Sequence, residues 1–580
     1  MLDSRLQAHV AAVRGAADGM FSMLRVWGGG IWLPSVWYDT CDEIGIMVYH
    51  DMQYAQNGHA PAATNVQAEE LRHQVRRLSA HPAIVVWDGC NECQVVMNTS
   101  TEIYASFVLK VVAEEDRSRP IWPSCPSAGW TAGVHKLTSM PIVGKDLSTP
   151  DSGPLIETHR PKWHGDGFAT VNGLTQLDPP PGPHPPCAQP PCNYQGLFPS
   201  NIPLNLTRQP TGPSEPNVFS SESPGASVMS SFESMSATLD PEHWGLHGGA
   251  SEDSCSGSNF KRSCTGDNSM AQRNYPCDNF IAVYWGMQEV PWLNETGAGP
   301  FKRQLFQCMI AQALIVKQNI ELTRATPRFG IIVWQLNEIW PTGGWGSVEY
   351  GNPAYPGQVI GGRFKPLHYW YRASLFTSVF ATCDRVKGLC YVKNDAPIPF
   401  TGTVVINATN FANAAVTTIE TRPISLAAGA GTIEWWESPA ITKLDPSTTV
   451  LEVIVTRLPG GNAPVITTAT LTASATISRN VVPLTTIEHM QLRDANVSAT
   501  PVRLGDVAFA ADITCDAAAM FVTMTTLAHG FFEDNAMVLR PPGARVGFVL
   551  SDPSPHVSAD EAWHAFSSSL RAEDVSVYQR

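Results

Sequence analysis

Long apolar runs and clusters of basic residues are both missing from this sequence. No stretch reaches the roughly 18 consecutive apolar residues of a membrane-spanning helix. Asp and Glu together number 52 against 38 Lys and Arg, and the formal net charge is −14. Nucleic acids and anionic membranes attract clustered Lys and Arg. We therefore expect no nucleic acid and no membrane among the partners of this protein.

The first residues lack the pattern of a secretory signal. A signal peptide carries an uninterrupted apolar core of about 7–15 residues. Here Leu2, Leu6, Val10 and Val13 instead recur at helical spacing. No signal peptide is predicted in this chain, and the sequence is expected to open inside a domain.

The cysteines do not form a zinc motif. Cys90 and Cys93 form one CxxC pair, and the second pair that a zinc site of this type requires is missing. The total of 13 Cys is odd, so the cysteines cannot all pair within one chain. Other closely spaced cysteines are candidates for disulfides in an oxidising compartment, namely Cys187 with Cys192, and Cys255 with Cys264 and Cys277.

The first part of the chain alternates short apolar runs with helical patterns. Helices are predicted around residues 66–79 and 101–115. Such alternation is typical of parallel strands joined by crossover helices, and a (β/α)₈ TIM barrel that lacks its first strand fits best. A doubly wound open sheet is the alternative. Strands are predicted at residues 23–27, 44–49, 83–87, 120–124, 154–159, 217–221 and 330–335.

From about residue 390 the pattern changes to strand-like alternation with few helices. Residues 403–406, 450–455, 519–525 and 546–550 are examples, and turn residues separate them. This pattern indicates two small β-sandwiches. We predict a partial TIM-barrel catalytic domain at 1–388, an immunoglobulin-like β-sandwich at 389–484 and a C-terminal β-sandwich at 485–580.

Two carboxylates follow predicted strands that are far apart in the sequence. Glu92 comes after the strand at 83–87, and Glu222 comes after the strand at 217–221. In a barrel, the carboxyl ends of the strands meet at one face, where active sites form. A pair of carboxylates at such a face is what glycoside cleavage requires, because one protonates the leaving oxygen while the other attacks the anomeric carbon. This chemistry needs no metal and no organic cofactor.

Several segments, in the expected order, resemble glycoside hydrolase family 2, and within it the β-mannosidase branch. They are MLRVWGGGIWLPSVWYDTCDEIGIMVYHDM at 23–52, VRRLSAHPAIVVWDGCNE at 75–92, VFSSESPGASVMSSFESM at 218–235 and FGIIVWQLNEIWPTGGWGSVEYG at 329–351. The resemblance covers nearly the whole barrel portion. It implies a retaining mechanism in which Glu92 is the general acid and then the base, and Glu222 is the nucleophile. Their carboxyl groups are then expected to lie roughly 5–5.5 Å apart.

The resemblance also implies a set of residues that bind the sugar. Asn91 is expected to bond the sugar 2-hydroxyl, and Arg25 to lie beside Glu222. Trp27 and Trp334 are expected to form the walls of the pocket, with plain core aromatics as the alternative. His159 is expected near the site, with a structural histidine as the alternative. Asp51 is expected to support the barrel rim rather than to take part in the chemistry.

The sequence departs from the family in two ways. The family carries an N-terminal sugar-binding-type sandwich, an immunoglobulin-like domain and a first barrel strand, and none of these is found here. In addition, Ser223 and Pro224 follow Glu222 where the family has an aromatic residue and then Gly. Proline restricts the residue before it to extended geometry, so the nucleophile carboxylate is expected to be displaced or to lose a packing contact.

The resemblance leaves three functions open. The first is a retaining exo-β-mannosidase that acts on oligosaccharides with terminal β-mannose. The second is another family 2 exo-β-glycosidase, of the glucosaminidase or galactosidase type. The third is a catalytically inactive fragment or carbohydrate-binding protein. By resemblance, the location is expected to be lysosomal or secreted.

Overall fold

The computed structural model describes residues 4–55, 61–93, 103–122, 124–125, 155–159, 204–208, 217–223, 230–246, 255–256, 263–264, 277–325, 328–338, 344–349, 363–429, 432–457, 476–551 and 557–579. Within these ranges no helix has both the length and the apolar character to cross a membrane.

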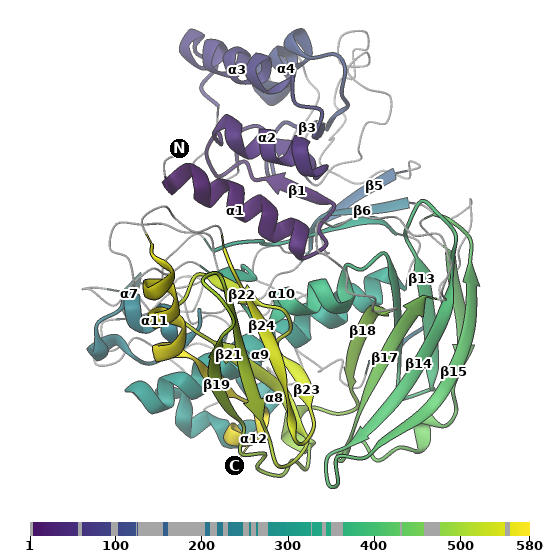
Figure 1. Cartoon of the computed structure of the whole chain (residues 1–580). Helices are drawn as coiled ribbons and strands as arrows, with labels where there is room; N and C mark the ends of the chain where they lie inside the picture. Colours follow the sequence, from purple (N-terminus) through teal and green to yellow (C-terminus); the bar gives the residue numbers. More distant parts are fainter. Residues whose placement is uncertain are drawn as a thin grey trace.

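Four parallel strands at the start of the chain form one sheet in the order β1-β2-β3-β4. Helices cover the outer side of this sheet, and the sheet lies at the top of Figure 1. Buried Leu71, Val75 and Leu78 face inward from α3, as their spacing predicts. The elements are α1 (Ser4–Asp18), β1 (Met23–Val26), α2 (Ser35–Ile44), β2 (Met47–Asp51), α3 (Asn65–Leu78), β3 (Ile84–Asp88), α4 (Lys110–Glu115) and β4 (Ile121–Trp122).

A second parallel sheet has the order β5-β6-β9. Its strands are β5 (Leu155–His159), β6 (Asn217–Ser223) and β9 (Arg328–Val333). Figure 1 shows β5 and β6 beside β1. Together the two sheets confirm all seven strands that the sequence predicts in this part of the chain.

Side chains from both sheets pack into one interior cluster. Tyr49 from β2, Trp122 from β4 and Phe219 from β6 form its aromatic centre, with ring centroids 5.5–6.1 Å apart. Met23 from β1 and Ile332 from β9 pack against the same cluster. A shared interior of this kind is what a barrel requires. Among the described residues, however, no ladder joins β4 to β5 or β9 to β1, so closure into a TIM barrel stays a prediction.

A long helix that the sequence patterns did not predict lies beneath the parallel sheets. Helix α9 (Ala298–Arg324) is buried at every residue from 304 to 321. Its apolar side chains share one core with α8 (Cys277–Trp285), α10 (Pro366–Trp370) and the strands that follow. Its Glu321 carboxylate accepts from Thr382 at 2.9 Å and from Asn480 at 2.8 Å. The helix thereby connects the α/β part of the chain to the first antiparallel sandwich.

Two pairs of antiparallel sheets complete the described chain. The first pair is β12-β13-β16 packed on β15-β14-β17-β18, and the second is β19-β20-β24-β22 with β23-β21-β25. The predicted sandwich architecture is therefore present, although the boundaries at 388 and 484 remain predictions. The strands are β12 (Val379–Cys383), β13 (Leu389–Asn394), β14 (Phe400–Asn410), β15 (Val416–Leu426), β16 (Thr432–Glu437), β17 (Thr449–Arg457), β18 (Thr476–Pro483), β19 (Ser498–Arg503), β20 (Ala508–Thr514), β21 (Ala519–Thr525), β22 (Gly530–Phe532), β23 (Met537–Leu539), β24 (Gly543–Leu550) and β25 (Arg571–Glu573).

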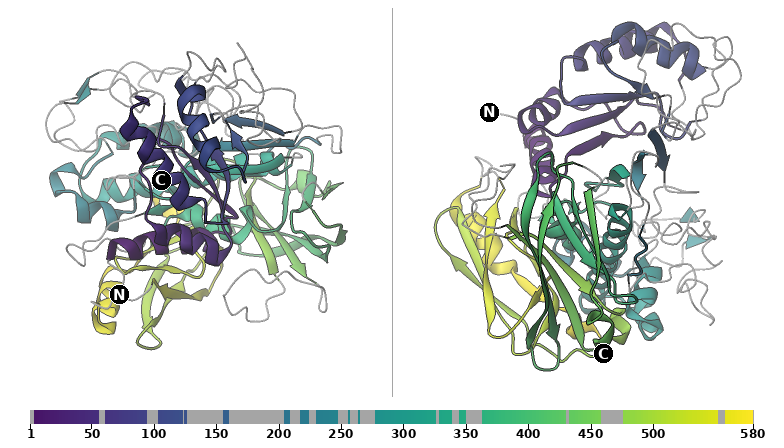
Figure 2. Two further views of the ribbon diagram at one scale, coloured as in Figure 1. Left: turned by 90° about the horizontal axis from the view of Figure 1, so that it is seen from above. Right: turned by 90° about the vertical axis from the view of Figure 1, so that its right-hand side faces the viewer.

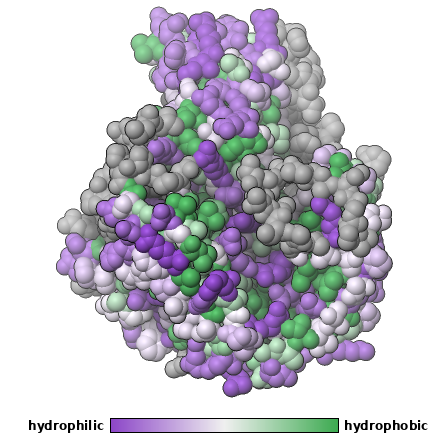
Figure 3. All heavy atoms as spheres, viewed as in Figure 1, coloured by the Kyte–Doolittle hydropathy of each residue, from purple (hydrophilic) through white to green (hydrophobic). Residues whose placement is uncertain are grey.

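The outer surface of the first parallel sheet's helices is mainly polar, as their position in the fold predicts. The right-hand view of Figure 2 shows the first parallel sheet and its helices standing apart from the two sandwiches. The outer side of α3 and α4 is mainly hydrophilic in Figure 3, and exposed Glu69, Glu70 and Glu114 lie there. A solvated outer face on helices with a buried inner face is the pattern expected of an outer helical layer.

A disulfide between Cys383 and Cys390 links the neighbouring strands β12 and β13 within one sheet of the first sandwich. Of the cysteine groups singled out in the sequence, Cys187 and Cys192 lie outside the described residues. Cys255 and Cys264 face each other across the short strands β7 (Cys255–Ser256) and β8 (Ser263–Cys264).

Candidate active site

Arg25 lies at the centre of the candidate site and joins the two parallel sheets. Its guanidinium donates to both carboxylate oxygens of Asp51 at 3.0 and 2.6 Å. It also donates to Asn91 Oδ1 at 2.7 Å and to Glu222 Oε2 at 3.0 Å. Asp51 and Asn91 belong to the first sheet and its loops, whereas Glu222 is on β6 of the second. One buried cation therefore holds three predicted site residues, Arg25, Asn91 and Glu222, in a single cluster.

The charge of Arg25 is set by this environment. Its side chain is 4% exposed, and Glu222 is equally buried. Burial alone lowers the pKa of Arg25, but the Asp51 and Glu222 carboxylates together raise that pKa well above its ordinary value. A guanidinium is charged at any physiological pH in any case. The site thus contains a permanent cation that faces two carboxylates.

Glu222 is fixed along β6 by neighbours on both sides. Its backbone pairs with that of His159 on β5, which places the predicted His159 next to it in register. The preceding residue, Ser221, lies 2.8 Å from the Cys125 sulfur, just beyond β4. The strand β6 continues through Ser223. Pro224, the predicted source of displacement, lies outside the described residues.

The loop after β3 places Asn91 and Glu92 at the same edge of the sheet. The backbone N–H of Asn91 donates to the Tyr54 carbonyl oxygen at 3.0 Å, and the backbone N–H of Glu92 donates to the Cys125 carbonyl oxygen at 2.7 Å. A disulfide between Cys90 and Cys93 encloses both residues. The backbone φ of Glu92 is +57°, in the sparsely populated left-handed region. Non-glycine residues held in this region concentrate at functional sites.

Arg25 also decides how the Asn91 side chain is oriented. A guanidinium has only donors, so the atom that faces it must be the amide oxygen. The opposite end of the Asn91 amide, the nitrogen, is then directed away from Arg25. The donor end of the Asn91 side chain is thus its nitrogen, on the side away from the guanidinium.

The two predicted pocket tryptophans come together in the structure. Trp27 follows β1 and Trp334 follows β9, and their rings meet edge to face with centroids 5.3 Å apart. Both are only partly buried. Trp345 lies 6.3 Å from Trp334 and extends the aromatic surface. Partly exposed indole faces of this kind can stack on the apolar face of a sugar ring.

His50 is a structural residue rather than part of the chemistry. Its ring is fully buried, and it bonds the Asp51 carbonyl through Nδ1 and the Tyr38 hydroxyl through Nε2, both at 2.7 Å. Burial lowers the pKa of His50 to about 3. A neutral imidazole with both nitrogens engaged holds the end of β2 in place.

The other carboxylates near these strand ends are engaged in ion pairs of their own. Glu338 pairs with Lys365, and Ser230 donates to both of its oxygens. Glu349 accepts from Ser231 at 2.7 Å. Glu233 pairs with an arginine of β25, Arg571, at 2.8 Å. These contacts connect the segments that follow the strands to one another and to β25.

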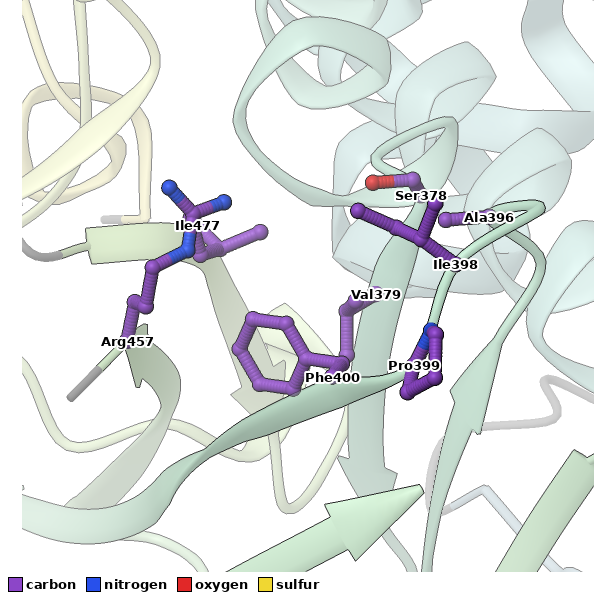
Figure 4. A pocket seen from close by; sticks show the side chains of 8 residues that line it. All are labelled: Ser378, Val379, Ala396, Ile398, Pro399, Phe400, Arg457 and Ile477. Atoms are coloured by element: carbon purple, nitrogen blue, oxygen red, sulfur yellow. The ribbon is translucent and has the colours of Figure 1, made fainter. Parts of the chain in front are cut away.

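Two further features do not belong to this cluster. Asp39, Asp42 and His81 could geometrically hold a cation, but Asp42 already accepts from His81 and from the Ala83 amide, each at 2.7 Å. A small pocket of about 10 Å³, room for one water molecule, lies in the first sandwich at Phe400 and Arg457 (Figure 4). None of the residues that line it is a predicted site residue.

Comparison with known proteins points in the same direction. No protein-family model matches the chain. The β-mannosidase of Bos taurus is 23% identical over 592 residues, which cover 96% of this chain and 57% of that protein. The crystal structure of the β-D-mannosidase of Dictyoglomus thermophilum has a TM-score of 0.60 at 19% identity, covering 99% of this chain and 58% of that one. An exo-chitosanase of Amycolatopsis orientalis has a TM-score of 0.57 at 12% identity, covering 99% of this chain and 62% of that one.

The chain spans less than two thirds of the length of each of these proteins. The two structural neighbours show a shared multidomain fold. The sequence relationship extends along nearly all of the chain. The chain is therefore similar to β-mannosidases over nearly its whole length.

Proposed function

We propose that this chain carries the catalytic part of a retaining exo-β-mannosidase, which removes terminal non-reducing β-D-mannose from oligosaccharides. The observation that carries the proposal is the Arg25 cluster. It ties Glu222 at 3.0 Å and Asn91 at 2.7 Å to one guanidinium, and Glu92 follows Asn91 directly. Glu222 and the loop that carries Glu92, which are far apart in the sequence, thus lie at one edge of the fold, and this supports a pair of carboxylates of the kind that double displacement requires.

The mechanism follows from the surroundings of each group. Glu222, which accepts a hydrogen bond from Arg25, attacks the anomeric carbon and forms a glycosyl-enzyme. Glu92 protonates the leaving oxygen and then removes a proton from the attacking water. The Asn91 amide nitrogen donates to the 2-hydroxyl of the sugar. The carboxyl groups of Glu92 and Glu222 are predicted to lie roughly 5–5.5 Å apart.

The sugar preference rests on two kinds of support. The tryptophan pair Trp27 and Trp334 forms one wall beside the cluster, and the sequence relationship is with β-mannosidases. The second candidate is an exo-β-glucosaminidase, which the likeness to an exo-chitosanase favours. The relatives named as β-mannosidases include mammalian ones, and a lysosomal or secreted location is proposed on the same basis.

The first experiment measures hydrolysis of chromogenic β-mannoside, β-glucosaminide, β-galactoside and β-glucuronide by the purified chain. Turnover of the mannoside, abolished in Glu222→Gln, supports the proposal. Glu69→Gln is the matched control, because Glu69 is an exposed carboxylate on α3 and its loss should leave the rate unchanged. Turnover of the glucosaminide in preference to the mannoside would select the second candidate.

The stereochemical outcome tests the mechanism separately. The first sugar released from a β-mannoside should be the β-anomer when followed by NMR. In Glu92→Ala the second step should stall, and azide, which needs no general base, should restore turnover and give a β-mannosyl azide. Release of the α-anomer would contradict the assignment of Glu222 as nucleophile.

A further inference from the structure

We propose that Asp51 is a positioning residue for the nucleophile: it anchors Arg25 and shares its positive charge, so that Glu222 is held by Arg25 without being neutralised by it. This deepens the proposed function, on which it rests. The sequence patterns assigned Asp51 only to support of the rim. Its contacts give it a more specific role.

Asp51 is the principal partner of Arg25. It is fully buried and receives two hydrogen bonds from the guanidinium, through Nε at 3.0 Å and Nη2 at 2.6 Å. Glu222 receives one, through Nη1 at 3.0 Å. A bidentate pair fixes the plane of a guanidinium, so Asp51 decides the direction in which Nη1 points at Glu222.

A third contact fixes Asp51 itself. The Gly28 amide donates to Asp51 Oδ2 at 3.0 Å. Residue 28 has to be glycine, because a Cβ there would lie 2.1 Å from the Tyr54 carbonyl oxygen and 2.8 Å from that of Met52. The glycine run after β1 thus allows its backbone to approach the end of β2 and to bond the carboxylate that holds Arg25.

The charges around Asp51 determine the effect of removing it. Besides Asp51, the groups that act on the Arg25 cation are the Glu222 carboxylate and the Cys125 thiol. His50, adjacent on β2, is neutral, and Asp88 on β3 is bonded to the Tyr49 hydroxyl at 2.9 Å. With Asp51 ionised, Arg25 is shared between two carboxylates.

Without the Asp51 charge, the whole cation acts on Glu222. The remaining pair is then neutral overall, and a proton added to Glu222 leaves an uncompensated buried cation. The Glu222 carboxylate should stay ionised to lower pH, since an opposite charge favours the ionised form. Glu222 should also be a weaker nucleophile, because Arg25 then neutralises more of its negative charge.

The test compares Asp51→Asn with Asp51→Glu and Asp116→Asn. Asp116 is a matched control: it is a buried carboxylate paired with Arg119, and it precedes β4 rather than following a strand. In Asp51→Asn, kcat on the β-mannoside should fall about ten-fold or more while KM changes little. The acidic limb of the pH profile of kcat/KM should move about one unit lower.

The two other variants separate charge from structure. Asp51→Glu keeps the charge, so its acidic limb should stay where that of the wild type lies, even if kcat falls. Asp116→Asn should lower the denaturation midpoint and leave the pH profile unchanged. An acidic limb in Asp51→Asn that stays in place or moves to higher pH would overturn the proposal.

A second readout works even if no glycoside is turned over. Water-soluble carbodiimides react with protonated carboxyl groups, so labelling of the Glu222 peptide, followed by mass spectrometry against pH, reports its protonation directly. A shift of the labelling profile to lower pH in Asp51→Asn supports the role of Asp51, whatever the substrate. An unshifted profile refutes it, whereas absence of turnover with a shifted profile refutes only the proposed function.

Discussion

His368 makes the attachment of the first helix to the rest of the chain sensitive to acid. Its ring is fully buried on α10 and lies 2.9 Å from both the Gly15 carbonyl oxygen on α1 and the Ser347 hydroxyl. Nε2 therefore carries the proton and donates to Gly15, while Nδ1 accepts from Ser347. The Phe364 ring packs against it, with centroids 3.9 Å apart.

The magnitude follows from the pKa of this ring. Burial lowers the pKa of His368 from 6.5 to about 3. In the unfolded chain His368 therefore binds a proton below pH 6.5, whereas in the folded chain it binds one only below about pH 3. The free energy of unfolding should fall as the pH drops through this window. At pH 5 the loss amounts to about 1.36 × 1.5, or about 2 kcal/mol.

The assay compares urea denaturation at pH 7 and pH 5 for the wild type and His368→Gln. Glutamine can replace both hydrogen bonds but does not titrate, so the variant should be less stable at pH 7 and lose about 2 kcal/mol less on acidification. His564→Gln, at an exposed position on α11 (Ala559–Ser569), is the matched control. Equal losses in the wild type and His368→Gln would refute the reasoning.

Three other substitutions test separate parts of the molecule. Arg25→Lys should lower kcat/KM by about 100-fold or more, because an ammonium is a single point of charge and cannot reproduce the planar fork that bonds Asp51 twice and also reaches Asn91 and Glu222; an active lysine variant would contradict the cluster's role. Trp334→Ala should raise KM about ten-fold with a smaller change in kcat, and an unchanged KM would remove it from the pocket. Glu321→Ala should lower the free energy of unfolding by about 3–5 kcal/mol, because buried Lys317 loses its partner. Much of this loss should return in Glu321→Leu with Lys317→Met, and urea denaturation measures both.

The parallel strands could be predicted from the sequence because their apolar runs are short and end in polar residues. Strands buried on both faces give nearly continuous apolar runs, and residues 83–87 and 330–335 are examples. The strand ends then identify the site, because parallel strands place their carboxyl ends together. Glu92 and Glu222 were predicted in this way, whereas Arg25 and Asn91 were predicted from the family resemblance.

Helix α9 shows where pattern reading fails. An exposed helix shows an apolar stripe, but α9 is buried on all sides and therefore has none. Its buried polar residues, among them Gln304, Lys317 and Glu321, interrupt the apolar pattern. Lys317 pairs with Glu321 within the helix, whereas other elements supply partners for Gln304 and Glu321, such as the Leu246 amide for Gln304 at 2.9 Å. Partners of this kind are distant in the sequence, and no local pattern reveals them.

The role of Asp51 was hidden for the same reason. It lies 26 residues from Arg25 in the sequence, and nothing in the local pattern of β2 distinguishes a rim carboxylate from one that anchors a cation. His50, one residue earlier, presents the opposite case. It resembles a catalytic histidine at a strand end, but burial lowers its pKa and keeps it neutral, and both ring nitrogens are already hydrogen-bonded. Exposure and partners, rather than residue type, separate the two.

The site and the fold depend on the same contacts. Arg25 to Glu222 and Cys125 to Ser221 cross from one parallel sheet to the other, and both lie beside the loop that carries Glu92. Relative movement of the two sheets would therefore lengthen these contacts and separate the two carboxylates together. Retention requires the carboxylates to stay within a narrow distance, so activity should be lost before secondary structure when the sheets separate. Activity in rising urea should accordingly decline ahead of the circular dichroism signal, and loss of both at the same urea concentration would contradict this coupling.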